Sequence, residues 1–482
     1  MSDIPRLGLT FDDVLIVPAA SEVLPRDTDV STRLTQDIKL KIPILSAPMD
    51  TVTECLMAIA MAREGGLGII QRNLPIEKQA EQVEIVKKAE NWIIRNPVQI
   101  TPTDTIQTAK ELMEKFNVTG LPVTENGKLK GLVTIRDLKF EKNLSQIVEE
   151  IMVKDIITAD EHIRMEEAKK ILHENRIEKL PIVDKKGFLK GLITIKDIEN
   201  KEKFPNSSLD ENGQLMVGAA IGPNDIERVK ALTDANVDIL VMDTAHGHSR
   251  MVVDSVRKLK QMFDVPIIAG NVATKEATED LIAAGADSVK VGVGPGSICS
   301  ARVITGVGVP QITAVQDCAE AAKEYDIPII ADGGIRYSGD IAKAIVAGAS
   351  SVMLGNLLAG TDEAPGRIIF MNGRNYKKYR GMGSVSAMER GGNTRYFREP
   401  KKKSKYIPEG VEGVVPCKGK VSEVLYQLIG GLKSSMGYAG AKTITDMQKS
   451  KFVRVTKAGI RESHPHDIYI TEESPNYNPN RF

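Results

Sequence analysis

The sequence predicts an α/β protein built on a closed (β/α)8 TIM barrel, with a smaller domain inserted between the second and third barrel strands. First, short apolar, β-branched runs alternate with helical stretches over most of the 482 residues, a pattern typical of a parallel sheet covered on both faces. Second, there are eight such units, which favours a closed barrel over an open doubly wound sheet. Third, an internal repeat interrupts the alternation once, and the chain is long enough for a second domain.

The eight predicted barrel strands are each bounded by polar or glycine turns. They span residues 42–47, 67–70, 215–221, 238–243, 265–271, 287–293, 327–334 and 350–356. Alanine-rich amphipathic segments such as "TKEATEDLIAAGA" and "SGDIAKAIVAGA" lie between them. Their Ala-Gly-Ala endings suit helix C-caps that lead into the next strand.

The inserted domain consists of two similar copies. "LPVTENGKLKGLVTIRDL" resembles "LPIVDKKGFLKGLITIKDI", and a predicted helix precedes each copy. This predicts a tandem pair of βαββα-like units. We expect residues 1–95 to form the first part of the barrel, residues 96–201 the insert, and residues 202–482 the rest of the barrel with a mobile flap at about 379–413 and a C-terminal segment.

Composition points to a small-molecule partner in the cytoplasm. Lys+Arg and Asp+Glu both count 64 and the formal net charge is zero, which argues against bulk electrostatic binding of nucleic acid or a membrane surface. The N-terminus has no basic and apolar signal-peptide pattern, and no uncharged run is long enough to span a bilayer. The four cysteines form no CxxC pair, as expected of free thiols in a reducing compartment.

Three consecutive predicted strand ends are rich in glycine: "GVGPGSIC", "ADGGIRYSGD" and "LGNLLAG". In a (β/α)8 barrel the loops after the strands carry the active groups, and phosphate often binds after the seventh and eighth strands. Glycine lets backbone N–H groups approach an anion, and Asp332 can accept hydrogen bonds from ribose hydroxyls. Glycines in one loop usually make only a tight turn, but three such loops favour a nucleoside monophosphate.

Cys299 follows the first of these glycine loops and is the candidate nucleophile, since a thiolate on an active-face loop can attack a bound ligand. A lone cysteine is more often a small core residue, and this interpretation is given to Cys55, Cys318 and Cys417. The flap is glycine-rich, highly charged and without apolar periodicity, as expected of a lid. Its Arg395-Tyr396 pair would place a cation and an aromatic ring in the site.

Two histidine pairs, "HGH" (His246, His248) and "HPH" (His464, His466), raise the possibility of a transition-metal site. Neither has a clear third ligand or a closed Cys/His set. The sequence therefore disfavours a structural zinc ion.

The motifs "GLTFDDVLIVP", "GPGSIC", "DGGIRYSGD", "YRGMGS", "EGVEG" and "ESHPHDIYIT" occur in this order. With them, the chain resembles the inosine-5′-monophosphate (IMP) dehydrogenase / GMP reductase family almost end to end, and its flap favours the dehydrogenases. The repeat resembles paired cystathionine-β-synthase (CBS) modules, whose G-h-x-T-x-x-D pattern implies that Thr134, Asp137, Thr194 and Asp197 bind a regulatory purine nucleotide. The alternative is a purely architectural insert.

The resemblance implies oxidation of IMP to xanthosine monophosphate (XMP) with NAD+, in guanine nucleotide biosynthesis. Cys299 would attack C2 of the hypoxanthine ring, a hydride would pass to NAD+, and Arg395, supported by Tyr396, would activate the water that hydrolyses the thioimidate. The implied substrate-binding residues are Ser297, Asp332, Gly333, Gly334, Gly355, Asn356, Tyr379, Arg380, Gly381, Met382, Gly383 and Glu409, and those for NAD+ are Asp243, Gly292, Val293 and Gly294.

A potassium ion is also implied by the resemblance. Its ligands would be carbonyl groups of Gly294, Gly296 and Cys299, completed by Glu462, Ser463 and His464 from a neighbouring subunit. The active site would then depend on a homotetramer, which CBS domains would stack into an octamer in some cases.

One position departs from the family pattern. The family usually has threonine two residues after the cysteine, whereas this chain has Ala301 in "CSAR". The neighbouring Ser300 offers a hydroxyl in a different direction, so hydrolysis is expected to be less efficient. Two alternatives stay open: a GMP reductase that uses NADPH, which the Arg395-Tyr396 pair disfavours, and a non-catalytic nucleotide sensor, which Ala301 supports and an intact Cys299 disfavours.

Overall fold

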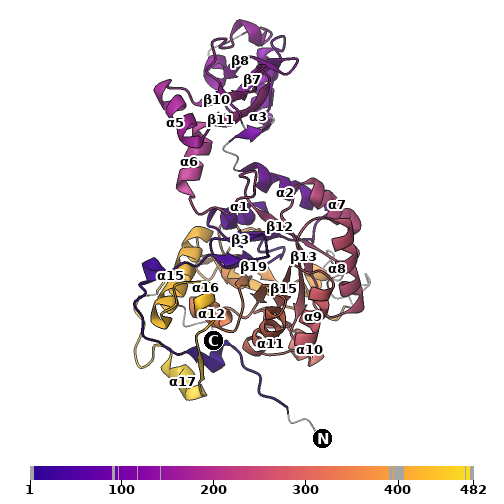
Figure 1. Ribbon diagram of the computed structural model, residues 1–482, viewed down its shortest axis with the longest axis vertical. Helices are drawn as coiled ribbons and strands as arrows, with labels where there is room; N and C mark the ends of the chain where they lie inside the picture. Colours follow the sequence, from indigo (N-terminus) through magenta and orange to yellow (C-terminus); the bar gives the residue numbers. More distant parts are fainter. Residues whose placement is uncertain are drawn as a thin grey trace. The chain divides into compact units, whose positions relative to one another are not determined.

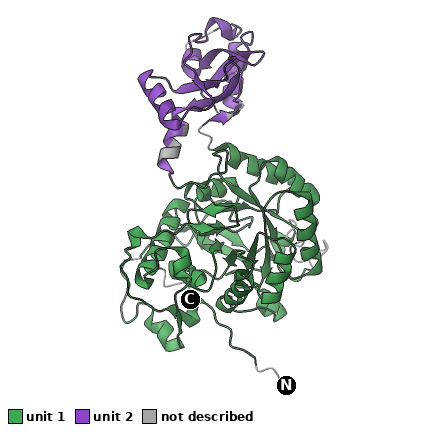
Figure 2. Cartoon of the chain, viewed as in Figure 1, with its two compact units in different colours: residues 1–89, 206–482 green, residues 90–205 purple. Residues whose placement is uncertain are grey.

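The computed structural model describes residues 5–89, 93–95, 97–116, 118–139, 141, 143–389, 395, 406–472 and 474–477, with the side chains of residues 197 and 200–202 left out. It divides into two compact units. Unit 1 comprises Met1–Ala89 and Asn206–Phe482, and unit 2 comprises Glu90–Pro205 (Figure 2). Nothing among the described helices is both long and apolar enough to cross a membrane.

Unit 1 contains the predicted (β/α)8 barrel, which is thereby confirmed (Figure 1). Eight strands close in the order β12-β13-β14-β15-β16-β17-β4-β5, and all neighbouring pairs are parallel. Seven of the predicted strand ranges contain an observed strand in full, and the strand at 267–272 runs one residue past the predicted range 265–271. Their bounds are β4 Ile44–Ser46, β5 Leu67–Ile70, β12 Val217–Ile221, β13 Ile239–Asp243, β14 Ile267–Val272, β15 Ser288–Val291, β16 Ile329–Asp332 and β17 Ser351–Leu354.

The strands are mostly apolar because both of their faces are buried. On β16, Ile330 packs in the barrel interior, whereas Ile329 and Ala331 pack in the layer between strands and helices. Side chains alternate between the two faces of a strand. Asp332, the last residue of β16, therefore faces the interior at the carboxyl end of the barrel.

Helices surround the barrel, and their sequences show why they form. α8 begins after Ser249, whose side chain accepts a hydrogen bond from Val252 N, a cap worth about 1 kcal/mol. Its buried residues recur at helical spacing and form one apolar face against the barrel. The helices of unit 1 are α1 Cys55–Arg63, α2 Ile76–Ala89, α7 Ile226–Asp234, α8 Arg250–Met262, α9 Lys275–Ala283, α10 Ala301–Thr305, α11 Gln311–Lys323, α12 Ser338–Val346, α13 Asn356–Ala359, α14 Val385–Met388, α15 Val421–Ala439, α16 Ile444–Met447 and α17 Lys457–Glu462.

A buried ion-pair cluster lies at the amino end of the barrel. The Nζ of Lys87 on α2 lies 2.8 Å from Asp210 Oδ2 and 2.7 Å from Asp238 Oδ2, and the lysine is almost fully buried. Asp238 directly precedes β13. The cluster thus joins α2 to the segments that enter β12 and β13, at the end of the strands opposite to Asp332.

Additional short strands lie outside the closed barrel. β18 (Ile368–Met371), β19 (Arg374–Arg380) and β20 (Glu412–Pro416) form an antiparallel sheet. β1 (Val14–Ile16) pairs with β21 (Phe452–Arg454), and β2 (Thr32–Arg33) pairs with β3 (Lys39–Leu40). The short 3-10 helices of this unit are η1 Phe11–Asp13 and η2 Pro25–Asp27.

The N-terminal motif "GLTFDDVLIVP" packs beneath the loop that follows β16. The buried ring of Phe11 lies against Gly334, where a methyl group would come within 3.3 Å of it. Asp12 pairs with Arg336, and Lys343 Nζ donates to Phe11 O. These contacts therefore fix the N-terminal segment against the loop that contains Gly333 and Gly334.

Unit 2 contains two similar halves, and each half consists of a β-hairpin and helices with its own hydrophobic core. The predicted insert, residues 96–201, lies within it. The first half of unit 2 consists of α3 Ile106–Phe116, β7 Gly120–Glu125, β8 Lys128–Thr134 and α4 Ile135–Leu138. The second half consists of α5 Met165–Glu174, β10 Lys179–Val183, β11 Leu189–Thr194 and α6 Ile195–Lys203. The remaining elements are β6 Ile94–Arg95, η3 Val148–Glu150 and β9 Ala159–Asp160.

Candidate active site

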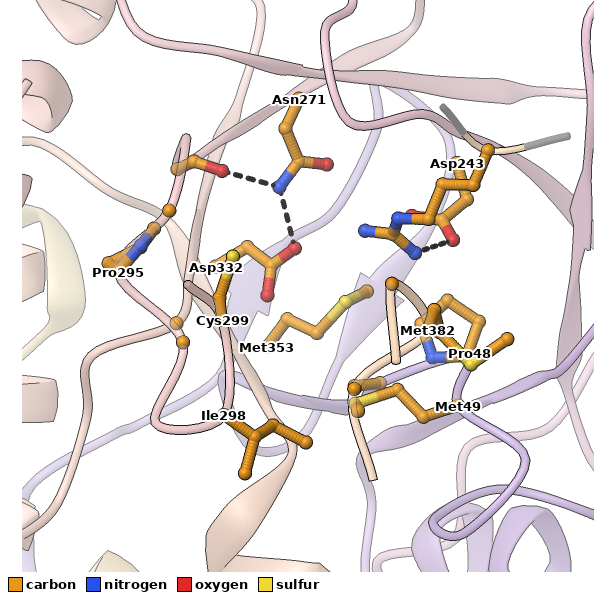
Figure 3. A pocket seen from close by; sticks show the side chains of 18 of the residues that line it. Pro48, Met49, Asp243, Asn271, Pro295, Ile298, Cys299, Asp332, Met353 and Met382 are labelled. Carbon is orange, nitrogen blue, oxygen red and sulfur yellow. Dashed lines mark hydrogen bonds and ion pairs between the residues drawn. The ribbon is translucent and has the colours of Figure 1, made fainter. Parts of the chain in front are cut away.

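A pocket of about 120 Å³ lies at the carboxyl ends of the barrel strands (Figure 3). It brings together residues that lie in or directly after the last part of six of the strands, and residues from the flap region. The predicted site residues that line it are Asp243, Gly292, Gly294, Gly296, Cys299, Asp332, Gly333, Tyr379, Gly381, Met382, Gly383, Arg395 and Glu409. The lining residues that sequence reasoning missed are Ala47, Pro48, Met49, Asn271, Pro295, Ile298 and Met353.

The loop that carries Cys299 is held by the segment before β20. Glu409 O accepts a hydrogen bond from Ser300 N at 2.9 Å and lies 3.6 Å from Cys299 Sγ. Val411 N donates to Ile298 O at 3.0 Å. The cysteine loop is thus paired, through its backbone, with the "EGVEG" motif at the end of the flap region. Glu409, which the resemblance implies binds substrate, has this backbone role as well.

Gly381 allows the close approach of these two segments. Its N–H donates to Val411 O at 2.9 Å, and a methyl group at this position would lie 3.0 Å from Ile298 O. A side chain at Gly381 would therefore press against the backbone of the cysteine loop. We infer a packing reason for this glycine in addition to the substrate contact that the resemblance implies.

The other cysteines lie in environments unlike that of a nucleophile. Burial raises the pKa of Cys318 to about 12, so its thiol stays protonated at neutral pH. Burial also raises the pKa of Cys55. Of the four free cysteines, Cys299 is the one that lines the pocket.

Asp243 ends β13 on the opposite side of the pocket from Cys299 and Asp332 (Figure 3). Its carboxylate forms an ion pair with the guanidinium of Arg395, whose backbone oxygen accepts from Ala245 N at 3.2 Å. Burial opposes ionisation of Asp243, but the positive charges of Arg395, Lys290 and Arg72 outweigh it and hold the pKa below its usual value. Arg395 therefore lines the pocket, while Tyr396 lies outside the described residues.

Lys290 and Asn271 form a polar floor beneath the pocket. Lys290 is fully buried, and its Nζ lies 2.6 Å from Asp332 Oδ2. Asn271 Nδ2 donates to Asp332 Oδ2 at 2.9 Å and to Gly292 O at 2.8 Å. The signal that would have found Lys290 is a lysine within the apolar strand "SVKV", because a buried lysine is almost always paired.

Gln311, at the start of α11, ties two of the loops together. It is fully buried, and its Nε2 donates to Val291 O at 2.9 Å and to Asp332 O at 3.1 Å. The two strand ends approach closely because Gly292 has no side chain: a methyl group there would lie 2.1 Å from Asp332 O. The backbone positions of Asp332 and the cysteine loop are therefore linked.

Arg380 was expected to bind substrate, but its side chain is directed elsewhere. It is buried and pairs with Asp50, and Nη1 donates to Ser386 Oγ at 3.0 Å. Asp50 also accepts from Asn73 Nδ2. Arg380 thus holds the loop after β19 to the loop after β4.

The remaining predicted substrate and cofactor residues adjoin the lining without belonging to it. Ser297 hydrogen bonds with the Tyr379 hydroxyl, and this hydroxyl would lie 2.9 Å from a methyl group at Gly355. Asn356 begins α13, and Val293 O accepts from Arg302 Nε. Burial raises the pKa of Tyr379, so its hydroxyl stays protonated and can donate.

Ala301 is the first residue of α10, and it is not among the lining residues. Ser300, its N-cap, makes no side-chain capping bond. Ala301 is half-buried. The position therefore adjoins the nucleophile without a hydroxyl of its own.

The predicted potassium ligands fall into two groups. Gly294, Gly296 and Cys299 share the cysteine loop, whereas Glu462, Ser463 and His464 lie at the end of α17. The ring of His464 packs near those of Tyr337 and Tyr477. Across the described part of the chain, no group of three or more His, Cys, Asp and Glu residues is placed to hold a metal ion.

In unit 2, Thr134 and Asp137 bond to each other. Asp137 Oδ2 accepts from Thr134 N at 2.8 Å and from Thr134 Oγ1 at 2.7 Å, as a capping box at the start of α4. Thr194 holds the equivalent place before α6, and the side chain of Asp197 lies outside the described residues. The motif thus has a local structural role in the first copy.

A thiol, carboxylates and a guanidinium gather in one pocket at the carboxyl end of a (β/α)8 barrel, the place where enzymes of this fold carry their active sites. A sequence model of the IMP dehydrogenase / GMP reductase domain matches residues 8–466. The chain belongs to the IMP dehydrogenase / GMP reductase family.

Several relatives span nearly the whole chain. The inosine-5′-monophosphate dehydrogenase of Aquifex aeolicus is 60% identical over 98% of this chain and 97% of its own. That of Bacillus subtilis is 56% identical over 99% of each. A crystal structure of a GMP reductase C318A variant from Trypanosoma brucei, in complex with guanosine 5′-monophosphate, has a TM-score of 0.88 and 44% identity, and covers 97% of this chain and 99% of that one.

Proposed function

We propose that this chain oxidises IMP to XMP with NAD+ and water, as an IMP dehydrogenase in guanine nucleotide biosynthesis. The observation that carries the proposal is that one pocket holds the Cys299 thiol, the Asp332 carboxylate and the Arg395 guanidinium. These are a nucleophile, a ribose acceptor and a base for hydrolysis. The full-length relatives with the dehydrogenase name support it.

The reaction divides into two steps at Cys299. In the first, the thiol would give its proton to solvent, Sγ would bond to C2 of the purine, and C2 would give up its hydride to NAD+, leaving a thioimidate and NADH. In the second, Arg395, after losing a proton to solvent, would take a proton from the water whose oxygen adds to C2. The Sγ–C2 bond would then break, XMP would form, and Arg395 would pass this proton to the departing sulfur, which restores the thiol. Asp332 would hold the ribose throughout.

Asp243 suits the nicotinamide riboside because its buried carboxylate can accept hydrogen bonds from two hydroxyl groups. NAD+ supplies the hydride acceptor when it is bound. In the structure Arg395 forms an ion pair with this same carboxylate. Arg395 and the riboside would therefore bind the Asp243 carboxylate at different stages of the reaction. This supports an order of events in which the flap enters the site after NADH leaves.

The cysteine loop suits a potassium ion in its donor chemistry, since carbonyl oxygens replace the hydration shell of K+. Gly296 O already accepts from Cys299 N at 3.0 Å, and a carbonyl has a second lone pair. The carbonyls of Gly294 and Cys299 would complete the part of the shell from this chain. Glu462, Ser463 and His464 of a neighbouring subunit in a homotetramer, or in an octamer, would supply the rest.

Reductive deamination of GMP with NADPH is the second candidate, and the similarity to the trypanosomal GMP reductase favours it. The position of Arg395 in the pocket favours hydrolysis and therefore the dehydrogenase. Incubation with IMP and NAD+ should produce NADH, whereas GMP and NADPH should show no NADPH consumption. The reverse pattern would identify a reductase, and no reaction with either pair would favour a nucleotide sensor.

Replacing Ala301 with threonine should accelerate hydrolysis of the thioimidate. The added hydroxyl would give the departing proton a second path, and a good hydrogen bond in the transition state is worth about tenfold in rate. The gain should be largest at low pH, where a guanidinium is hardest to deprotonate. NADH burst and steady-state rates between about pH 6 and pH 9 measure both steps.

A larger side chain at position 301 would have a different effect if the surroundings are packed around alanine. It would then clash, weaken IMP binding and slow both steps. An unchanged hydrolysis rate over the whole pH range would show that the alanine is neutral.

The CBS-like pair is proposed to bind a purine nucleotide without taking part in the chemistry. Deleting residues 96–201 should leave a folded, active barrel, because both ends of the insert return to one connection between barrel strands and unit 2 has its own cores. The full chain should give a calorimetric signal with ATP, ADP, AMP, GDP or GTP. Loss of activity in a soluble deletion variant, or no signal with any of these nucleotides, would count against the proposal.

A further inference from the structure

We propose that Lys290 is a positioning residue that aligns Asp332 and Asp243, and with them the substrate and cofactor sides of the pocket, from inside the barrel. This inference rests on the proposed function, which gives the two carboxylates their ligands. It assigns Lys290 no contact with the reacting atoms.

The strand alternation places Lys290 in the barrel interior. Its neighbours Val289 and Val291 on β15 pack in the outer layer between strands and helices. Lys290 therefore points inward, as Asp332 does on β16. A methyl group at Gly270 on β14 would lie 2.9 Å from Lys290 Cβ, so the adjacent strand leaves room for this side chain.

The three donors of the lysine ammonium meet three acceptors. Nζ bonds to Asp332 Oδ2 at 2.6 Å and to Asn271 Oδ1, and it lies 3.4 Å from Asp243 Oδ1. An ammonium has three N–H groups, and each of these acceptors comes from a different strand of the barrel. One buried cation thus joins β13, β14 and β16 at the height of the pocket.

This arrangement fixes the orientation of Asp332. Both the lysine and Asn271 bond to its Oδ2. Within the described part of the chain, its Oδ1 has no hydrogen-bond partner, and Asp332 lines the pocket. The lysine therefore holds one oxygen in the floor and leaves the other for a ligand hydroxyl.

The same cation extends the network to the cysteine loop. Because Asn271 Oδ1 accepts from Lys290, its Nδ2 is turned toward Asp332 and Gly292 O. Gly292 begins the loop that carries Cys299. Loss of the lysine would thus disturb both carboxylates and the amide that ties them to this loop.

Loss of the charge would also leave Asp332 and Asp243 less neutralised in a buried site. Breaking a buried pair by removing one partner is costly because the remaining charge is uncompensated. Lys290→Met should therefore raise KM for IMP and for NAD+, each by at least about tenfold, since a lost bond between charged groups is worth that much or more. Lys290→Arg, which keeps the cation, should recover part of both KM values.

Lys87→Met is a matched control. Lys87 is also a buried lysine that pairs with two aspartates, but it lies at the amino end of the barrel. Its partner Asp238 directly precedes β13, and Asp243, a partner of Lys290, is the last residue of the same strand. The two aspartates are five residues apart, which is about 16 Å along a strand. Lys87→Met should lower the melting temperature as Lys290→Met does, while both KM values stay within about twofold of those of the unmodified chain.

Steady-state kinetics of the full chain, thermal melts and calorimetric titration of IMP test the inference. KM values for Lys290→Met equal to those of Lys87→Met would overturn it, as would failure of Lys290→Arg to improve on Lys290→Met. If Lys290→Met does not fold, Lys290→Gln and Lys290→Arg give the same comparison. If the unmodified chain forms no NADH from IMP and NAD+, the proposed function is wrong. In that case calorimetry still tests the inference, because IMP binding by the Lys290 variants equal to that of the unmodified chain would overturn it.

Discussion

Cys299→Ala should abolish NADH formation from IMP and NAD+ while IMP still binds. Without Sγ no bond forms to C2, so the hydride has no route to leave; loss of a nucleophile of this kind costs at least about 10⁴-fold in turnover. Calorimetry with IMP would confirm that the pocket is intact. The expected result is normal binding without turnover.

Cys417→Ala is the matched control for this variant. Cys417 is also a free, half-buried cysteine, but it follows β20 and is not among the residues that line the pocket. Its loss should leave the rate near that of the unmodified chain. NADH production by Cys299→Ala at a comparable rate would refute the role of the thiol.

Arg395→Ala should separate the two half-reactions. The base acts only after NADH has formed, and a positioned base contributes roughly 10²–10⁴-fold. Rapid mixing should therefore show a burst of NADH close to one per site, followed by a slow steady state. The ion pair between Arg395 and Asp243 adds a second effect, because its loss frees the carboxylate for the riboside. KM for NAD+ should not rise.

Arg26→Ala is a suitable control for this variant because Arg26 is an exposed arginine in η2. It should change neither the burst nor the steady state. If the first turnover of Arg395→Ala slows as much as its steady state, Arg395 acts in the hydride step and the assigned role is wrong.

The barrel could be predicted from the sequence because each strand is buried on both faces and therefore reads as an apolar run. The position of Asp332 followed from the same reasoning, since it ends the run "IIAD". Cys299 was proposed as a nucleophile from its place after a glycine loop, whereas Asp243 was assigned its role by the family resemblance. The structure brings all three into one pocket.

The polar floor of the pocket could not be predicted in this way. Lys290 and Asn271 lie within strands whose neighbours are apolar, and their partners are distant in the sequence. For Arg380 the motif "YRGMGS" suggested a contact with a ligand. In the structure its guanidinium forms an ion pair with Asp50, which lies more than three hundred residues away in the sequence. Such long-range ion pairs leave no periodic signal in the sequence.

Thr134 and Asp137 show how one motif can suit two purposes. Their spacing matches a capping box, which the structure contains, and it also matches the nucleotide pattern of CBS modules. The sequence alone cannot separate the two because both need a hydroxyl and a carboxylate three residues apart at a helix start.

Mass spectrometry of Arg395→Ala during turnover tests the central claim, covalent catalysis by Cys299 on IMP, most directly. With hydrolysis slowed, acid quenching after mixing with IMP and NAD+ should yield protein heavier by one IMP less two hydrogens, and fragmentation should place the adduct on Cys299. The same variant with NAD+ omitted should show no stable adduct. An unmodified Cys299 despite a full burst of NADH, or an adduct on another cysteine, would contradict the account.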